Sequence, residues 1–451
     1  MLLFGEIFHE GCDVVKLLEM NGTPTGITQE EQDTFLKTPQ RLVCTKKLES
    51  LFEEQKRKSK GIVMKLYLEN FKFFNDTFGY HYGGLLLREI AKYLCTIPGA
   101  DVYRYTGVEF LLVLEGYTYA QMQSVAEEIV KRFERIWSIQ ETDCICTMNM
   151  GVVFYPEFAQ NAAELMENLD HAIAHSAQMG QNQLVEFDSQ LYAALQRRKG
   201  IARAITAAVA EDKMNIGYMP VFCLPEDRFV RAEVCIQILS EEYGMIGEAE
   251  FLPVAEQSGQ IYALSSYAIH KVCELIRKLL DEGVEFEALS MHISPIQLLQ
   301  ERFIQELAQV LRKYHIPKGK LALAMDDNVT LTSFTSVNIA LQQLSEMGIE
   351  LMLSGFGIAY TGISSVLALP VDIVKLERLF IWQMETNERS ASLIEGLCSI
   401  ADSLGLKLIA EGVETKNQIE QLTSFGCNYH QGLYYSSMVE GSALQELFKS
   451  K

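Results

Sequence analysis

The chain has 451 residues, of which 48% are hydrophobic and 22% charged, so its composition is globular and excludes wholesale disorder or a fibrous repeat. Asp and Glu number 59 against 39 Lys and Arg, and the formal charge of -20 argues against nucleic acid as a partner because polyphosphates are repelled. No stretch approaches the roughly 18 apolar residues of a membrane span, and the opening residues lack a basic region and cleavage site, so we expect a cytoplasmic protein without a membrane segment.

Strand and helix patterns alternate through the first half of the chain, as in α/β and α+β folds. Residues 1–32 form an N-terminal extension to which the sequence assigns no role. The expected elements that follow are a charged amphipathic helix over 46–60, a strand over 61–70, a turn-containing segment over 73–84, a helix over 85–94, a hairpin over 101–116, a helix over 120–136, a strand over 146–156 and a helix over 162–179.

The second half repeats one unit, a strand pattern followed by a helix pattern. Residues 189–213 are helical in pattern except at Gly200, and we place the domain boundary there. The apolar strand patterns after it lie over 215–222, 230–238, 288–294, 320–327, 349–357, 371–377, 406–414 and 429–435. Eight strands with intervening helices in about 250 residues predict a (β/α)8 barrel, in which the chemistry lies where strands end.

The second half also carries a series of short motifs in a fixed order. They are YMPV at 218–221, EVC at 233–235, EFLPVAE at 250–256, LPVD at 369–372 followed by Lys375, EGVET at 411–415 and QG at 431–432. Together they resemble the EAL family of cyclic di-GMP phosphodiesterases over residues 200–446. The resemblance implies a TIM-type barrel domain, which we assign to 200–451.

A looser series lies in the first half. It comprises Asp33, Pro39, Arg41, Phe71-Lys72, Asn75-Asp76, Phe78-Gly79, TGVEF at 106–110, Asp170, Gly180 and Asn182. These positions resemble the GGDEF family of diguanylate cyclases. The resemblance implies an α+β domain over 33–188, with a palm-like central sheet flanked by helices, and a helical linker over 189–199 that joins it to the barrel. The predicted fold class is α/β.

The resemblance to the EAL family implies a site for two divalent cations. In that family the cations are held at strand ends by Glu, Asn, Glu, an Asp pair and Glu. Such a pair of Mg²⁺ ions needs several oxygen ligands and bridging carboxylates. Glu233 and Glu411 match two ligand positions, and Glu414 and Gln431 are further remnants of the site. The substituted positions are His292 for Asn, Ala324 for Glu, and Ser354 and Gly355 for the Asp pair. We therefore expect no two-metal centre.

Two side chains at this site leave alternatives open. His292 could join Glu233 and Glu411 in a transition-metal site, or it could be a strand-end residue satisfied by a hydrogen bond, which we favour. Lys375 matches the lysine that helps to position the attacking water in the family. Without metals, we hypothesise that its ammonium lies between Glu233 and Glu411 and offsets the repulsion between the two carboxylates.

The positions that contact the ligand are substituted as well. The phosphate-contacting arginine of the family is Gln237 here, and the glutamine of its YQPI motif is Met219. A dinucleotide with two negative charges would face Glu233 and Glu411 with only Lys375 nearby, and charge-assisted contacts supply most of the affinity for such ligands. We expect weak or no binding of cyclic di-GMP.

The cyclase site has lost its charged groups in the same way. The metal-binding aspartate is Tyr67, and the acidic third position of the signature is Val108. The guanine-contacting aspartate is Gly84, and the triphosphate-binding Lys and Arg are Ala177 and Gln181. Nucleotidyl transfer needs Mg²⁺ and cationic clamps, so we expect no cyclase activity.

Four positions remain from the cyclase pattern, and each has a structural explanation. They are Asn75, Gly107, Glu109 and Phe110. Asn75 with Asp76 is either a guanine contact or a turn, and we favour the turn. Gly107 fits a hairpin, and Glu109-Phe110 begin a strand.

Three classes of function follow from these losses. We favour a catalytically inactive regulatory or scaffold protein without a cofactor, which binds protein partners of unknown identity and forms a possible homodimer through the barrel face near Ser354. The first alternative is a receptor that binds cyclic di-GMP or another guanine ligand without turnover. The second is a weak phosphodiesterase that uses Glu233, His292, Lys375 and Glu411 with an unusual metal.

Overall fold

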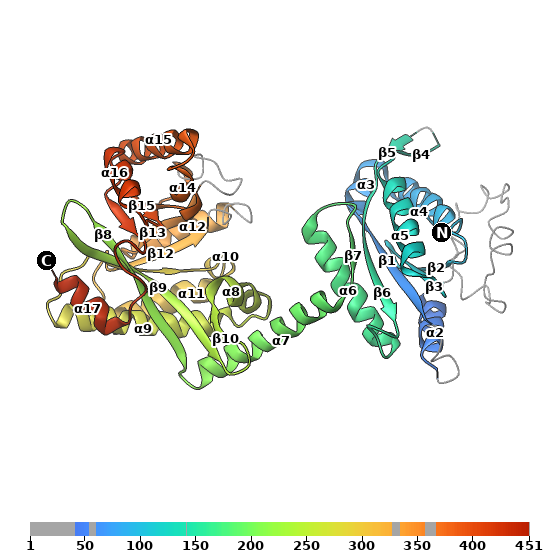
Figure 1. The fold of residues 1–451 in the computed structure, drawn as a ribbon, viewed down its shortest axis with the longest axis horizontal. Coiled ribbons are helices and arrows are strands. Elements are labelled where there is room, and N and C mark those ends of the chain that lie inside the picture. Colours follow the sequence, from blue (N-terminus) through green and yellow to red (C-terminus); the bar gives the residue numbers. More distant parts are fainter. Residues whose placement is uncertain (1–40, 54–59, 141, 327–333, 357–366, 451) are drawn as a thin grey trace, which may run out of the picture. The chain divides into compact units, whose positions relative to one another are not determined.

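The computed structural model describes residues 41–53, 60–140, 142–326, 334–356 and 367–450, which form two compact units that divide between Leu195 and Gln196 (Figure 1). We call them the first unit and the barrel unit. The predicted extension, residues 1–32, and the motif positions Asp33 and Pro39 lie outside the described residues. Within the described residues, no helix has both the length and the apolar character that crossing a bilayer requires.

The first unit is a five-stranded sheet in the order β2-β3-β1-β6-β7, with helices on both faces. Its strands are β1 (Gly61–Glu69), β2 (Asp101–Thr106), β3 (Glu109–Glu115), β6 (Thr147–Tyr155) and β7 (Leu184–Glu186). Its helices are α2 (Arg41–Leu51), α3 (Phe71–Phe78), α4 (Tyr80–Leu94), α5 (Tyr119–Phe133) and α6 (Ala162–Met179). A separate small hairpin joins β4 (Trp137–Ile139) to β5 (Thr142–Cys144).

Strand β1 lies at the centre of this sheet and is buried on both faces. Its residues Ile62, Met64 and Leu66 belong to the core that α4 and α5 cover, whereas Val63 belongs to the core under α2 and α6. A strand buried on both sides has a nearly continuous apolar sequence, which is why the pattern over 61–70 predicts it well. Lys65 is a single charged residue in the middle of that run, and Glu69 ends the strand.

Two local predictions for the first unit are wrong. Asn75 and Asp76 do not form a turn but lie inside α3. The reason is the helical spacing of Phe71, Phe74 and Phe78, whose rings pack together and override the turn propensity of the Asn-Asp pair. The chain changes direction at Gly79 instead, where φ is +86°. The charged helix predicted over 46–60 is α2, which begins earlier and ends at Leu51.

The predicted interruption at Gly200 is also wrong, because helix α7 (Ser189–Ala210) runs through it. Gly200 is buried, and a Cβ atom there would lie 2.2 Å from the ring of Tyr243. The glycine therefore permits a close ring contact with the helix and does not break it.

The barrel unit is a closed eight-stranded barrel, as predicted. The strand order is β9-β11-β12-β13-β14-β15-β16-β8, closed by pairing of β8 with β9, and β10 (Gly244–Gly247) extends one edge. The barrel strands are β8 (Met214–Cys223), β9 (Arg228–Ser240), β11 (Ala288–His292), β12 (Leu321–Asp326), β13 (Glu350–Phe356), β14 (Ile373–Leu376), β15 (Lys407–Glu411) and β16 (Tyr429–Gln431).

Helices cover the outside of the barrel. They are α8 (Glu248–Gln257), α9 (Ile261–Asp281), α10 (Pro295–Leu298), α11 (Glu301–Lys313), α12 (Phe334–Glu346), α14 (Arg378–Gln383), α15 (Glu388–Leu404), α16 (Lys416–Ser424) and α17 (Gly441–Lys449). One strand departs from the all-parallel arrangement, because β8 is antiparallel to both β9 and β16. Only residues 224–227 join β8 to β9, and so short a connection makes a hairpin and not a crossover.

Inside the barrel, an apolar layer separates two charged ends. The apolar layer is a buried cluster of Val221, Ala324, Met352, Ile373 and Ile409. Alternate residues of each strand point inward, and the same order of charge, apolar group and polar group recurs on two strands that are separated by β14. The residues in this order are Glu350, Met352 and Ser354 on β13, and Lys407, Ile409 and Glu411 on β15.

The end of the barrel where the parallel strands begin is held by Arg231. This arginine is 1% exposed, and its guanidinium lies 2.8 Å from Glu287 and 2.5 Å from Glu350. Lys407 lies 2.6 Å from Glu287, and the Tyr429 hydroxyl donates to the same carboxylate at 2.9 Å. Burial raises the pKa of Glu287, but its bonds from Lys407 and Arg231 outweigh burial, so the pKa is lowered overall.

Replacing Arg231 tests how far the barrel depends on this network. Arg231→Met leaves Glu287 and Glu350 with Lys407 as the one cation in contact with both, among the described residues, and we expect a loss of about 3 to 5 kcal/mol in the free energy of unfolding of the barrel unit. Urea denaturation followed through Trp382, in a common Trp137→Phe background, measures it. The matched control is Arg228→Met on the same strand, whose more exposed pair with Glu226 is worth less than about 1 kcal/mol. Equal losses in the two variants would contradict the assignment.

Candidate functional site

The candidate site lies where the parallel strands of the barrel end, and Lys375 is at its centre. The Lys375 ammonium lies 2.6 Å from Glu233 Oε2 and 2.9 Å from Glu411 Oε2, and its side chain is 5% exposed. Gln431 Nε2 donates to Glu233 Oε2 at 3.1 Å and to the Met219 carbonyl at 3.3 Å. The hypothesis that Lys375 bridges the two surviving carboxylates is confirmed.

The charges in this cluster are mutually dependent. Burial alone would lower the pKa of Lys375, but the carboxylates of Glu233 and Glu411 outweigh burial and raise it well above its usual value. Burial likewise raises the pKa of Glu233, while Lys375 and the Gln431 amide lower it, and the net pKa is lowered. Lys375 and Glu233 are therefore both charged at neutral pH, and each of the two carboxylates contacts the lysine.

His292 makes a hydrogen bond at a strand end, as we favoured. Its Nε2 atom lies 3.2 Å from Asp326 Oδ1, at the end of the neighbouring strand β12. Burial lowers the pKa of His292, whereas Asp326 and the negative charges of Glu248 and Glu233 raise it, with a net increase. Its Nδ1 atom is buried and has no hydrogen-bond partner in the part of the chain that the structure describes.

Two acidic residues of this site escaped the sequence analysis. Asp326 is the partner of His292, and the only signal was an acid at the end of an apolar strand pattern. Glu248 begins helix α8 and accepts a hydrogen bond of 2.6 Å from the backbone N–H of Ile236. Burial raises the pKa of Glu248 to about 6. No local pattern marks Glu248 as part of a site, since its neighbours in the barrel are distant in sequence.

The substituted metal positions supply little that could hold a cation. Ala324 is fully buried in the apolar layer, and Ser354 and Gly355, close to the end of strand β13, bring no carboxylate. Among the described residues, no group of three or more His, Cys, Asp or Glu side chains is placed to hold a metal ion. The two surviving carboxylates share one lysine, Asp326 is paired with His292, and Glu248 accepts from the Ile236 N–H, so the donors do not fit a pair of Mg²⁺ ions. Gly357 and residues 358–366 of the altered loop lie outside the described residues.

The other predicted ligand positions are engaged locally. Gln237 lies on β9 and its Oε1 atom accepts from Asn215 Nδ2 at 3.0 Å. The backbone N–H of Glu414 donates to Gln418 Oε1 at 2.7 Å, next to the capping box in which Thr415 starts α16. Met219 pairs across the hairpin with Glu233.

The first unit repeats the arrangement of the barrel, with a lysine between two acids. Lys65 is 4% exposed, and its ammonium lies 2.8 Å from Glu109 and 2.6 Å from Asp170. Burial lowers the pKa of Lys65, but the bonds to Asp170 and Glu109 raise it overall. The sequence analysis missed Lys65, although a single charge inside an apolar strand pattern was a usable signal.

The remaining positions of the cyclase pattern do not converge on this lysine. Gly107 and Val108 form the tight turn between β2 and β3, and Arg104 donates to the Gly107 carbonyl at 2.8 Å. Phe110 is fully buried in the core. The other positions of the pattern are spread over several elements: Tyr67 on β1, Asn75 on α3, Gly84 on α4, Ala177 on α6, and Gln181 after α6.

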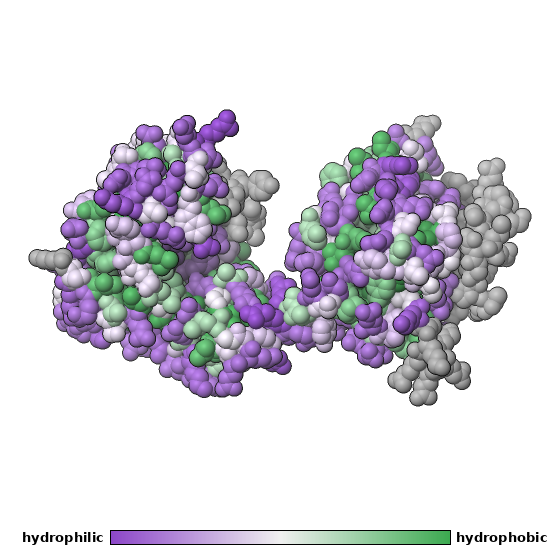
Figure 2. Space-filling view, viewed as in Figure 1, coloured by the Kyte–Doolittle hydropathy of each residue, from purple (hydrophilic) through white to green (hydrophobic). Residues whose placement is uncertain are grey.

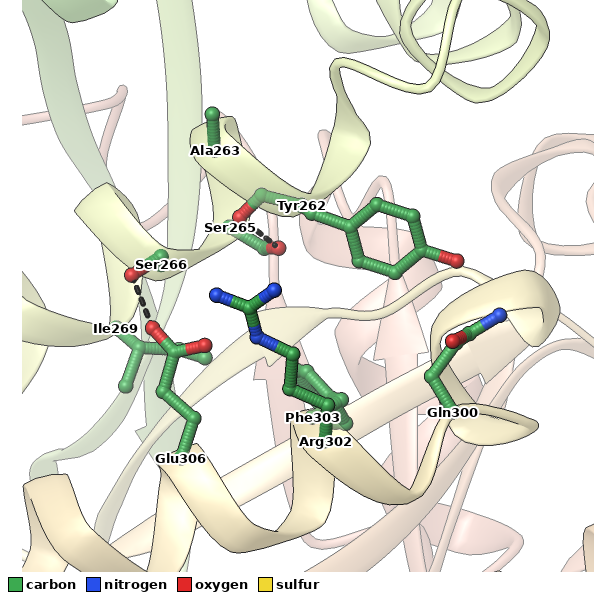
Figure 3. A pocket seen from close by; sticks show the side chains of 9 residues that line it. All are labelled: Tyr262, Ala263, Ser265, Ser266, Ile269, Gln300, Arg302, Phe303 and Glu306. Carbon is green, nitrogen blue, oxygen red and sulfur yellow. Dashed lines mark hydrogen bonds between the residues drawn. The ribbon is translucent and has the colours of Figure 1, made fainter.

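A separate cavity of about 450 Å³ lies outside the barrel, between α9 and the start of α11. Figure 3 shows the Arg302 guanidinium extending into it from α11, with Tyr262 on the facing helix and Glu306 beside it. The Ser266 hydroxyl donates to Glu306. None of the site residues predicted from the sequence lines this cavity.

Comparisons with known proteins give the same two domains. A model of the EAL domain family matches residues 202–437, and a model of the diguanylate cyclase GGDEF domain matches residues 31–183. The chain is 27% identical over 403 residues to the bifunctional diguanylate cyclase/cyclic di-GMP phosphodiesterase MucR of Pseudomonas aeruginosa, covering 89% of this chain and 59% of that protein. It is 25% identical over 390 residues to the cyclic di-GMP phosphodiesterase PdeR of Escherichia coli, covering 86% and 58%.

Among solved structures, the chain is similar to an S helix-GGDEF-EAL fragment of Vibrio cholerae LapD bound to cyclic di-GMP. The TM-score is 0.55 at 19% identity, and the match covers 90% of this chain and 96% of that one. This likeness shows the fold. The chain spans less than two thirds of the length of the curated relatives named above.

The central role of Lys375 is testable by removing its charge. Lys375→Met leaves Glu233 and Glu411 facing each other without a cation, and we expect a loss of about 3 to 5 kcal/mol in the stability of the barrel unit. The double variant Lys375→Met with Glu233→Gln removes one of the opposed charges and should recover part of that loss. Urea denaturation of both variants measures the effect. An equally unstable double variant would show that repulsion is not the cause.

Glu248 predicts a specific pH dependence. Its pKa is higher in the folded chain than in the unfolded chain, so the folded state binds the extra proton between about pH 4.5 and 6, and stability falls as pH rises through that window. In Glu248→Gln this contribution is absent. Relative to the natural chain, the variant should therefore gain up to about 2 kcal/mol between pH 4.5 and pH 7. Denaturation midpoints across this range measure it, and a constant difference would contradict the assignment.

Proposed function

Because the chain belongs to the EAL domain family and carries a GGDEF domain ahead of the barrel, we propose that it acts in cyclic di-GMP signalling as a catalytically inactive regulatory protein. The observation that carries the proposal is the position of Lys375. A phosphodiesterase of this family needs its carboxylates for cations, and here the two that survive both contact one ammonium.

The surroundings of Lys375 support the same conclusion. A cation entering between Glu233 and Glu411 would have to displace a buried lysine that already makes two charged contacts. It would then find apolar Ala324 where a third carboxylate is needed. Two carboxylates bound to one lysine offer neither the charge nor the number of oxygen atoms that two hard cations require.

The cyclase-like unit supports the proposal independently. Glu109, which survives from the signature, is held by Lys65, and Tyr67 and Val108 supply no carboxylate. Nucleotidyl transfer depends on metal ions that neutralise the triphosphate, so this unit has no means to bind and activate GTP in that way.

In the proposed role, the chain acts by binding other proteins on its surface. The role includes action in the cytoplasm, in accord with the nine described cysteines, which are all free thiols. It also includes a partner protein or a second copy of the chain on the barrel face near Ser354. Cyclic di-GMP would bind weakly or not at all, since Gln237 and Met219 offer no cation to its phosphates.

Turnover and binding assays test the proposal directly. The purified chain is incubated with cyclic di-GMP and, separately, with GTP, each with Mg²⁺ and with Mn²⁺. We expect no linear pGpG from cyclic di-GMP and no cyclic dinucleotide from GTP. Calorimetry with up to high micromolar cyclic di-GMP should give no heat. Formation of pGpG that is lost in Glu411→Gln would overturn the proposal, and saturable binding without turnover would replace it with a receptor function.

A further inference from the structure

The first unit contains an apolar pocket that the proposed function does not use. It lies between α3 and the segment from β5 to the start of β6, and its volume is about 710 Å³, within the range of small-molecule sites. Of the cyclase-pattern positions named above, Phe71, Phe78 and the substituted Gln181 line it, whereas Asn75, Gly84 and Glu109 do not. Figure 2 shows apolar residues gathered at the end of this unit where β5 lies.

Aromatic side chains form one wall of the pocket. The ring centroids of Phe71 and Phe74 are 6.1 Å apart, and those of Phe74 and Phe78 are 4.8 Å apart. Their spacing along α3 places all three rings on one helix face, toward the pocket. The facing wall includes Cys144 and Cys146, and burial raises the pKa of Cys146 to about 12, so this thiol is a neutral, apolar group.

Large apolar side chains at the rim are left exposed to water. Phe73 is 72% exposed and Ile145 is 70% exposed, and they line the pocket from opposite sides, one on α3 and one after β5. Ile136 adds a third, at 56%. Exposed apolar groups gathered around a concave apolar surface mark a binding site, because a ligand that covers them removes apolar area from water.

The charges of the lining select the kind of ligand. Among the described residues that line the pocket there is no lysine, arginine or histidine, but there are two carboxylates, Glu69 and Asp143. One oxygen of Glu69 accepts from Asn149 Nδ2 at 2.6 Å, and one oxygen of Asp143 accepts from the Ser138 hydroxyl at 2.7 Å. A phosphate or carboxylate group would meet two like charges here, whereas an ammonium group would meet two opposite ones.

We propose that this pocket binds an amphiphile with an apolar acyl or ring body and a cationic head. The body lies against Phe71, Phe74 and Phe78 and is covered at the rim by Phe73 and Ile145. The head lies toward Glu69 and Asp143. This site is distinct from the barrel mouth, and its occupancy is independent of whether the chain binds cyclic di-GMP.

Chain-length-matched amphiphiles test the proposal on the full chain. Decyltrimethylammonium and decyl sulfate, both below their micellar concentrations, are titrated by calorimetry. We expect saturable binding of one decyltrimethylammonium per chain, at least tenfold tighter than decyl sulfate. Equal affinity for the two head groups, or no saturable binding of either, would overturn the proposal.

Variants locate the site. Phe73→Ser and Ile145→Ser change exposed side chains, so they should leave the fold intact and weaken decyltrimethylammonium binding at least tenfold. The double variant Glu69→Gln with Asp143→Asn should remove the preference for the cationic head. The control is Leu42→Ser on α2 of the same unit, 59% exposed, which should change nothing. If Phe73→Ser instead converts a dimer into a monomer in light scattering and amphiphiles do not bind, the face is covered by a second copy and the proposal fails.

Discussion

The contact of Lys375 with Glu233 and Glu411 decides what the barrel mouth can do. Two carboxylates at the end of a barrel must be balanced by positive charge, because uncompensated charges in a partly buried place are costly. Divalent cations provide that balance when enough carboxylates are present to hold them. Here one ammonium provides it, at 2.6 and 2.9 Å, and the acids that would attract further cations are replaced. The surviving residues of the site therefore stabilise the fold on their own.

The same solution occurs in the first unit, on an unrelated sheet. Lys65 reaches Glu109 and Asp170 from the central strand, and its side chain is buried. In both units, then, a buried lysine on a strand of the sheet contacts two carboxylates carried by other elements. In each unit the lysine offsets the repulsion between the two carboxylates and so stabilises the elements that carry them.

Much of this architecture could be predicted from the sequence, because strand periodicity and the order of motifs are local signals. The eight barrel strands and the role of Lys375 follow from them. The errors have physical causes: aromatic packing made α3 a helix through Asn75, and the close approach of Tyr243 kept α7 helical at Gly200. Glu248 was missed because no local pattern marks it. Lys65 and Asp326 do interrupt or end apolar strand patterns, but their partners lie far away along the chain, so the local signal alone does not say what they contact.

The alternation of inward residues explains how the barrel mouth can change in sequence without loss of the fold. Along β13 and β15 the apolar middle layer, with Met352 and Ile409, fixes the barrel, while the residue two positions later only reaches the mouth. Replacement at the mouth, as at Ser354, therefore leaves the packing beneath it unchanged. Ala324 is the informative exception, since it lies in the apolar layer itself and its methyl group packs there. A carboxylate at that position would be buried against apolar neighbours and would need a cation to balance it, whereas the alanine methyl group needs none.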